Sequence, residues 1–199
     1  VIRFQKEKNA ASIQKEVERY QMKHKLITDE LTEICNRSAL RDAFQKIEKD
    51  ASENIYALAM IDLDNFKTLN DTLGHDKGDQ CLKEFGRILS QNCPGDVTPF
   101  RFGGDEFCII FQNKTLGRTL EICKNIQNDL KKCTMQHESI ALTASIGIAY
   151  YAQPMSATQL LRNTDFALYR SKTLKDAICV YDDKHQFDAF TGMDFNCFL

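Results

Sequence analysis

The pattern of apolar and polar positions predicts strands alternating with helices from residue 36 onwards. Residues 55–61 and 107–111 are apolar runs without glycine or proline, as expected for strands buried inside a sheet. Apolar positions recur with a helical period over residues 116–133 and alternate with polar or small ones over residues 142–148. The predicted elements are, in order, a helix at 36–50, a strand at 55–62, a mostly helical segment at 66–72, a helix at 79–91, hairpin strands at 99–102 and 107–112, a helix at 116–133, a strand at 140–150, a helix at 156–173 and a strand at 177–181. These elements predict an α/β (α+β) sandwich in which helices flank a central mixed, mainly antiparallel sheet.

The two ends of the chain differ from this pattern. Residues 1–28 are charged and contain no glycine or proline. Apolar or semi-apolar residues recur near this end with the 4-3-4-3-4 spacing of a heptad seam: Ile13, Val17, Tyr20, His24, Ile27 and Leu31. The spacing fits either a single amphipathic helix packed on its own domain or a parallel coiled coil that pairs two protomers. Residues 183–199 show no period and are interpreted as a C-terminal tail, which leaves residues 29–182 as the one folded domain.

Residues 101–107 carry the most informative local pattern, Arg-Phe-Gly-Gly-Asp-Glu-Phe, which predicts a strand broken by a tight turn. Gly103 and Gly104 allow positive φ and lack a Cβ, so the backbone can turn sharply and approach a ligand closely. Asp105 and Glu106 follow at the bend, where a metal ion or a phosphate could reach them. Alone, this pattern would fit an ordinary acidic hairpin tip.

A second group of acidic residues follows the first predicted strand. Asp62 and Asp64 are two residues apart, so in an extended chain their side chains point to the same side. With a carboxylate from the hairpin they would form an all-oxygen site that suits Mg²⁺ holding nucleotide phosphates, and Lys67 could add a positive charge. The turn-rich residues 74–79 then lead into a helix, for which Asp79 could simply be the N-cap.

Together these motifs resemble the GGDEF domain family of diguanylate cyclases. The family pattern Asp-x-Asp-x-Phe-Lys-x-x-Asn-Asp is matched at residues 62–71, Gly-His-x-x-Gly-Asp at 74–79 and Gly-Gly-(Asp/Glu)-Glu-Phe at 103–107. The opening motif Asp-x-Leu-Thr-Gly-Leu-Pro-Asn-Arg is matched in part at residues 29–37, and the resemblance extends over residues 29–182. It implies a fold similar to the palm of polymerases and to class III nucleotide cyclases, preceded by an N-terminal helix. It also implies an enzyme that condenses two GTP into cyclic di-GMP and two pyrophosphates.

The resemblance implies roles for the acidic residues and for Lys67. Asp62 would bind a metal ion through its carboxylate and Leu63 through its backbone carbonyl. Asp105 would be a second metal ligand and the candidate proton acceptor, and Glu106 would share metal binding or the role of base. The sequence does not decide which of these two takes the proton. Lys67 matches the residue that steadies the transition state, and the implied cofactor is Mg²⁺ (or Mn²⁺), with two ions per active site.

For the substrate, the resemblance implies a site that reads guanine and holds phosphates. Asp79 and Asn70 match the guanine-reading positions, because a carboxylate accepts hydrogen bonds from the N1–H and the amino group that adenine cannot offer. His75 falls where some members contact the substrate, although a histidine in a turn is more often simply exposed. In the similar subgroup that makes mixed cyclic AMP–GMP, serine stands at the position of Asp79, so this chain is expected to use two GTP. The implied substrate-binding set is Asn70, Asp79, His75, Phe66, Lys172 and Lys175.

Three departures from the family pattern change these expectations. Pro94 and Val97 stand where the product-inhibition motif Arg-x-x-Asp would be, so feedback binding at that site is expected to be absent. The Gly-Arg pair late in the family pattern is replaced by Lys175 and Asp176, so the second phosphate contact is either lost or supplied by Lys175. The Gly-Leu-Pro of the opening motif is replaced by residues 33–35, Glu-Ile-Cys.

Composition and charge exclude several other classes of protein. A net charge of −2 without a basic cluster argues against a nucleic-acid surface. No apolar run reaches the roughly 18 residues of a membrane span, so no membrane segment is expected in this chain. The eight cysteines form no Cys-x-x-Cys pair and indicate reduced thiols in a cytoplasmic protein, although the full-length protein could be membrane-anchored. The chain begins with Val1, which we interpret as a piece of a longer protein.

The expected assembly follows from the chemistry. Since each domain would hold one GTP, the resemblance predicts a homodimer with facing active sites. It favours the coiled-coil interpretation of the N-terminal helix, connected to an upstream sensor domain. The alternatives are a GGDEF domain that binds GTP or cyclic di-GMP without turnover, and another cyclase on the same palm with a mononucleotide or hybrid product. The intact hairpin and guanine-reading residues favour the active diguanylate cyclase.

Overall fold

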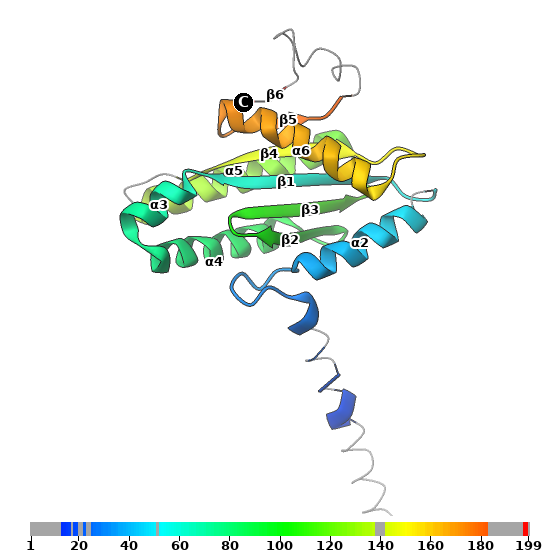
Figure 1. Cartoon of the computed structure of the whole chain (residues 1–199), viewed down its shortest axis with the longest axis horizontal. Helices are drawn as coiled ribbons and strands as arrows, with labels where there is room; N and C mark the ends of the chain where they lie inside the picture. Colours follow the sequence, from blue (N-terminus) through cyan, green and yellow to red (C-terminus); the bar gives the residue numbers. More distant parts are fainter. Residues whose placement is uncertain are drawn as a thin grey trace, which may run out of the picture.

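The structure is a computed structural model that describes residues 13–16, 18–19, 22, 25–50, 52–137, 142–182 and 197–198. Within these residues, helices cover both faces of a six-stranded sheet in the order β2-β3-β1-β4-β5-β6 (Figure 1). The elements are, in chain order, α2 (Arg37–Asp50), β1 (Tyr56–Asp64), α3 (Phe66–Leu73), α4 (His75–Asn92), β2 (Val97–Gly103), β3 (Glu106–Gln112), α5 (Leu116–His137), β4 (Thr143–Tyr150), α6 (Ala157–Leu174), β5 (Ile178–Val180) and β6 (Cys197–Phe198).

The sheet is mixed and mainly antiparallel, as the sequence predicts. The central strand β1 pairs antiparallel with β3 on one side and with β4 on the other. β2 and β3 form an antiparallel hairpin, whereas β5 joins β4 in parallel after the crossover through α6. In the predicted C-terminal tail, Cys197–Phe198 form β6 and pair antiparallel with β5, and residues 183–196 lie outside the described part of the chain.

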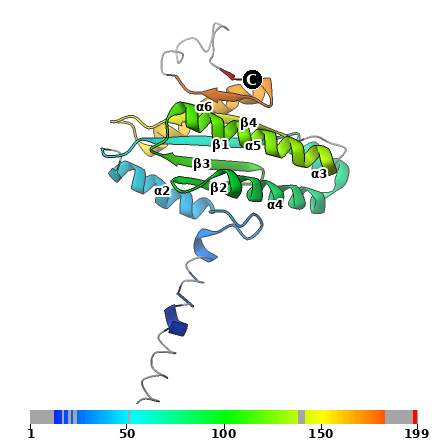
Figure 2. The same ribbon diagram turned by 180° about the vertical axis from the view of Figure 1, so that it is seen from behind.

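Strand β1 is buried on both faces, which explains its continuous apolar run. Helices α4 and α5 cover one face of the sheet (Figure 2). The side chains of β1 that pack on this face are Ala57, Ala59, Ile61 and Leu63. The side chains on the face covered by α2 and α6 are Tyr56, Leu58 and Met60. Because side chains alternate along a strand, Asp62 and Asp64 continue this second series at the end of β1. Both carboxylates therefore lie on the α2–α6 face, on the same side as predicted.

Several element boundaries differ from the prediction by a few residues, and two of these differences concern predicted site residues. Helix α4 begins at His75 rather than at residue 79, with Gly74 as its N-cap at φ 86°. Asp79 is therefore the fifth residue of the helix, and the interpretation of Asp79 as an N-cap is wrong. Strand β1 continues to Asp64, so that both aspartates belong to the strand itself.

The predicted heptad seam is only partly described. Residues 13–16, 18–19, 22 and 25–27 are helical, whereas Val17, Tyr20 and His24 lie outside the described residues. Leu31 is not on this helix: it lies in the turn that follows and packs against the core. The pairing of two protomers through this helix stays a prediction.

Two further expectations concern membranes and thiols. None of the described helices combines the length and apolar character that crossing a bilayer requires. The cysteines from Cys35 to Cys179 are free thiols, in agreement with the prediction. Burial raises the pKa of Cys93 and of Cys108 to about 12, so these two thiols stay protonated and unreactive at neutral pH.

Candidate functional site

The candidate site forms at the C-terminal end of β1, where several predicted residues meet. Asp62 lies opposite Glu106 in the register of β1 with β3. Lys172 of α6 reaches the same place, with its Nζ atom 2.6 Å from Oδ2 of Asp62. Asp105, at the hairpin turn, accepts a backbone hydrogen bond from the N–H of Leu63 over 3.4 Å. The fold thus gathers the predicted metal ligands and one predicted phosphate-binding lysine from two strand ends, a hairpin turn and a helix.

The charges at this point act on one another. Burial raises the pKa of Asp62; Lys172 lowers it, Asp105 and Glu106 raise it, and the net change is an increase. Burial lowers the pKa of Lys172, but the hydrogen bond and charge of Asp62 and the two other carboxylates outweigh this effect and raise it. Three carboxylates therefore act on one ammonium group, which Asp62 contacts directly, and the excess of negative charge would stabilise an additional cation.

Gly147 of β4 allows α6 to lie close enough to the sheet for Lys172 to reach Asp62. A Cβ atom on Gly147 would lie 2.1 Å from the backbone N of Leu168 and 2.5 Å from the carbonyl O of Thr164. The backbone of α6 therefore rests directly on β4, where only a hydrogen atom fits. Lys172 is one helical turn beyond Leu168, on the same side of the helix, and is carried over the end of the sheet.

The hairpin turn is held from outside by a partly buried ion pair between Arg101 and Asp29. Arg101 donates from Nε and Nη2 to the carbonyl O of Gly104 over 3.2 and 2.9 Å, and from Nη1 to Oδ1 of Asp29 over 3.0 Å. Thr32 donates to the same Oδ1 from its N–H and its hydroxyl, over 2.9 and 2.7 Å. Burial raises the pKa of Asp29, but the donors on Thr32 and Arg101 outweigh it and hold the pKa below its ordinary value. Gly104 has a φ of 56°, which suits glycine at the turn.

Sequence reasoning missed this contact between the opening motif and the hairpin. We call the ion pair of Asp29 with Arg101, together with the hydrogen bonds from Arg101 to Gly104, the brace. Asp29 and Arg101 are 72 residues apart, so no local pattern connects them. The available signal was that each belongs to a matched motif and that their charges are opposite. The brace makes the opening motif part of the site, although Asp29 itself is not among the predicted ligands.

The sequence suggested that Asp64 would join Asp62 in an all-oxygen metal site, but the structure gives Asp64 other partners. Its carboxylate accepts hydrogen bonds from the hydroxyls of Thr143 and Ser145 over 2.7 and 2.8 Å, and from the N–H of Asp176 over 3.0 Å. The residue is only 6% exposed. With these donors bound, Asp64 joins β1 to β4 and to the loop after α6, and it is not available as a metal ligand.

The loop after α6 places Lys175 and Asp176 at different ends of the site. Nζ of Lys175 donates to Oδ1 of Asn65, in the turn between β1 and α3, over 3.0 Å. Asp176 forms an ion pair with Lys131 of α5. Lys175 has a φ of 56°, in the region that glycine tolerates best, which explains why the family pattern has glycine there. Lys175 thus lies where it could meet a phosphate of the substrate, whereas Asp176 faces α5.

The predicted guanine-reading residues lie where α3 meets α4. A Cβ atom on Gly78 would stand 1.9 Å from Oδ1 of Asn70, so the amide of Asn70 fills the space beside the helix residue that precedes Asp79. Oδ1 of Asn70 is buried and has no hydrogen-bond partner among the described residues. Asp79 and His75 are exposed, the latter on the first turn of α4.

Two other predicted residues occupy the helix that follows β1. Lys67 is exposed near the start of α3. Phe66 packs in the main core and is 8% exposed, so a contact with substrate would have to come from its backbone.

The fit of this site to a metal ion can be tested on its donors. Asp62, Asp105, Glu106 and the carbonyl of Leu63 would offer oxygen atoms, which Mg²⁺ prefers. In the part of the chain that the structure describes, no three His, Cys, Asp or Glu side chains lie close enough to hold a metal ion by themselves. The donor chemistry and the excess of negative charge fit Mg²⁺, with Lys172 now beside Asp62. Metal binding stays a prediction.

Comparison with known proteins gives these features a context. The family model "Diguanylate cyclase, GGDEF domain" matches residues 26–176. The chain is 33% identical over 156 residues to the diguanylate cyclase DgcS of Shewanella oneidensis, which covers 76% of this chain and 51% of DgcS. It is 32% identical over 155 residues to the diguanylate cyclase DosC of Escherichia coli, which covers 75% of this chain and 34% of DosC. The chain thus spans about half the length of DgcS and about a third of DosC.

Solved structures show the same fold. The coiled coil and GGDEF domain of DgcB from Caulobacter crescentus, in complex with c-di-GMP, matches with a TM-score of 0.74 and 26% identity, over 87% of this chain and 98% of that one. The diguanylate cyclase SiaD of Pseudomonas aeruginosa, in complex with its activator SiaC, matches with a TM-score of 0.72 and 24% identity, over 89% of this chain and 73% of that one. These matches confirm the predicted fold class.

Proposed function

Because the chain belongs to the GGDEF family of diguanylate cyclases, we propose that it condenses two molecules of GTP into cyclic di-GMP and two pyrophosphates. The observation that carries this proposal is the meeting of Asp62, Glu106 and Lys172 at the end of β1, beside the hairpin turn. Phosphoryl transfer needs opposite charges held around the reacting phosphate, because the developing negative charge must be neutralised.

The reaction forms a bond between the 3′-oxygen of one GTP and the α-phosphorus of the other. The bond from that phosphorus to the β-phosphate oxygen breaks, and pyrophosphate leaves. Asp105 or Glu106 takes the hydroxyl proton, since both carboxylates lie at the hairpin end that faces β1. Lys67 and Lys172 hold phosphate oxygens, for which Lys172 exchanges Asp62 for the substrate. When bound by Asp62, Asp105 and the carbonyl of Leu63, Mg²⁺ supplies charge neutralisation at the phosphates.

Recognition of guanine is assigned to Asn70 and Asp79. The carbonyl oxygen of Asn70 has no partner among the described residues, and a buried acceptor without a donor is costly. The amino group of guanine can satisfy this acceptor once the amide turns toward the ligand. The exposed carboxylate of Asp79 can accept from the N1–H and the amino group, which adenine lacks in this arrangement.

The active unit in this proposal is a homodimer, since each domain holds one GTP and the product is symmetric. The N-terminal helix pairs the protomers and connects to an upstream sensor domain. The match to a DgcB structure that comprises a coiled coil and a GGDEF domain supports this arrangement.

The decisive experiment is incubation of the purified chain with GTP and Mg²⁺ at high protein concentration, with products identified by mass spectrometry. Asp62→Asn keeps the shape of the side chain and should lower the rate by about 100-fold or more, because it removes a charge at the reacting phosphate. Asp42→Asn, an exposed change on α2, is the matched control and should leave the rate unchanged. Absence of cyclic di-GMP despite measurable GTP binding would refute the proposal.

A second candidate function is binding without turnover. It is favoured by one observation: the position that carries a second phosphate-binding arginine in the family holds Asp176, which pairs with Lys131 instead. In that case the chain would bind GTP or cyclic di-GMP and transmit the bound state to a partner. Equilibrium dialysis with both nucleotides, beside the product assay, separates the two functions.

A further inference from the structure

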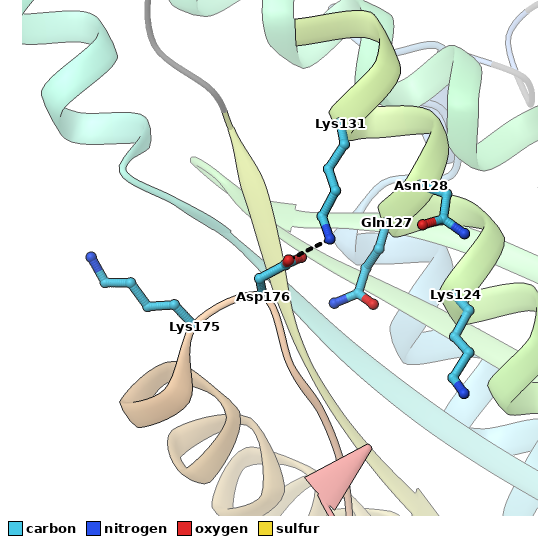
Figure 3. A pocket seen from close by; sticks show the side chains of 6 residues that line it. All are labelled: Lys124, Gln127, Asn128, Lys131, Lys175 and Asp176. Carbon is cyan, nitrogen blue, oxygen red and sulfur yellow. Dashed lines mark ion pairs between the residues drawn. The ribbon is translucent and has the colours of Figure 1, made fainter. Parts of the chain in front are cut away.

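A pocket separate from Asp62, Asp105 and Glu106 lies between α5 and the loop after α6 (Figure 3). Its volume is about 350 Å³. The residues that line this lysine pocket are Lys124, Gln127, Asn128, Lys131, Lys175 and Asp176. The four on α5 follow the i, i+3, i+4, i+7 spacing of one helix face, and the other two form the opposite wall.

The pocket exists because β5 is short. β5 pairs only with Ile146–Ile148 of β4, so the edge of β4 before Ile146 has no neighbouring strand there. Nε2 of Gln127 donates to the carbonyl O of Ala144 over 2.7 Å and thereby satisfies an edge group that β5 does not reach. The floor of the pocket is therefore a hydrogen-bonded, polar surface.

The charge of the pocket is opposite to that of the whole chain. It contains three lysines and one aspartate, whereas the chain carries a net charge of −2. Lys131 extends toward Asp176 and forms an ion pair with it, while Lys175 extends away from α5 (Figure 3). The lining side chains thus carry a net charge of +2 around a cavity large enough for a compact ion, which favours an anion.

One feature selects among anions. Oδ1 of Asp176 is buried and has no hydrogen-bond partner among the described residues. A fully ionised anion such as sulfate has no hydrogen to donate and is repelled by this carboxylate. Orthophosphate and pyrophosphate keep a P–OH group near neutral pH, which can donate to Oδ1 once the carboxylate turns toward the pocket, while their other oxygens face the lysines.

The wall of the pocket also touches the candidate active site. Lys175 and Asp176 have φ values of 56° and 50°, which residues with a Cβ rarely adopt. Each is tied to the end of β1: Lys175 through Oδ1 of Asn65, and Asp176 through its N–H to Asp64. A ligand that displaces these two residues would therefore also displace the turn that precedes Phe66 and Lys67.

We propose that the lysine pocket binds a compact phosphate anion that carries a P–OH group, inorganic pyrophosphate or orthophosphate, between Lys124, Lys131 and Asp176. Through Lys175 and Asp176 the bound anion is linked to the end of β1. The link to catalysis rests on the proposed function, in which pyrophosphate is the leaving group, whereas the binding itself does not.

The test is a calorimetric titration of the chain with sodium pyrophosphate, orthophosphate and sulfate at fixed ionic strength, without GTP or divalent metal. Both phosphates should bind at least tenfold more tightly than sulfate, and the two phosphate titrations decide which is the ligand. Lys124→Gln should weaken phosphate binding about tenfold, the worth of one charge-assisted hydrogen bond. Lys132→Gln removes an exposed lysine that directly follows Lys131 on α5, and it should change phosphate binding less than twofold. Lys67→Ala should also have little effect, because it removes a cation of the candidate active site and not of the pocket.

Asp176→Asn tests the selection. This variant keeps an acceptor but loses the charge that repels sulfate, so the preference for phosphate over sulfate should disappear. Amide ¹H–¹⁵N spectra of the wild type should show pyrophosphate-dependent shifts at Gln127 and Asn128. Equal affinity for sulfate in the wild type, equal effects of Lys124→Gln and Lys132→Gln, or no binding at millimolar phosphate would each overturn the proposal. A chain that binds pyrophosphate but forms no cyclic di-GMP would sink only the proposed function.

Discussion

Substitution of Gly147 by alanine should displace α6 from the sheet and disrupt the candidate site without changing any charged residue. The new Cβ would lie 2.1 Å from the N atom of Leu168, whereas ordinary contacts begin at 3.4 Å, so α6 must move by roughly 1.3 Å. Both partners at this contact are backbone atoms within regular structure, so neither can rotate away. Overpacking of this kind costs about 1–3 kcal/mol of the free energy of unfolding. For a chain of this size, that loss lowers Tm by about 2–12 °C.

The same displacement should break the contact between Lys172 and Asp62. Their 2.6 Å separation would exceed the hydrogen-bond range after a shift of about 1 Å or more. Urea and thermal unfolding followed by circular dichroism measure the stability, and the product assay measures the site. Gly117→Ala is the matched control, because a Cβ there meets nothing within 4 Å and should leave both unchanged or raise stability by up to about 1 kcal/mol. A Gly147→Ala protein with wild-type unfolding midpoint and activity would refute the steric argument.

Three other predictions concern the brace, the strained loop and the pH dependence. Arg101→Met should lower the free energy of unfolding by about 2 kcal/mol, because the charged donor that joins Asp29 to Gly104 is lost; an unchanged urea midpoint would contradict it. Lys175→Gly should raise the free energy of unfolding by about 1 kcal/mol, since glycine accepts a φ of 56°; a lower midpoint would show that the backbone is not strained there. Burial raises the pKa of Asp62 above 3.8, so the folded state binds this proton more tightly, and the carboxylate reduces stability as pH rises above 3.8 through the raised pKa. Urea titrations of wild type and Asp62→Asn between about pH 4 and 7 should therefore show the wild type gaining stability relative to the variant as the pH falls, and the opposite slope would contradict the cause.

The sequence was most informative where one local rule acted alone. The apolar run of β1 and the Gly-Gly turn were predicted because burial and turn geometry each leave a direct pattern. The start of α4 was not predicted, because Gly74 and Gly78 together looked like a turn. In the structure Gly78 lies inside the helix, and its missing Cβ makes room for the amide of Asn70.

The sequence predicted which residues belong to the site better than it predicted how these residues contact one another. Asp62 and Asp64 look equivalent in the sequence, yet the carboxylate of Asp64 accepts hydrogen bonds from Thr143, Ser145 and the loop after α6. That difference depends on which residues β4 brings opposite the end of β1, and strand pairing over 79 residues is not encoded locally. The contact between Asp29 and Arg101 was missed for the same reason.

The position of β1 at the centre of the sheet has a consequence for how the protein loses its site. The strand that carries Asp62 near its C-terminal end is hydrogen-bonded along both edges and buried on both faces. Its amide hydrogens should exchange with solvent only on global opening, among the slowest in the chain. The geometry around Asp62 should therefore persist until cooperative unfolding, so heat inactivation and loss of tertiary structure should coincide at one temperature.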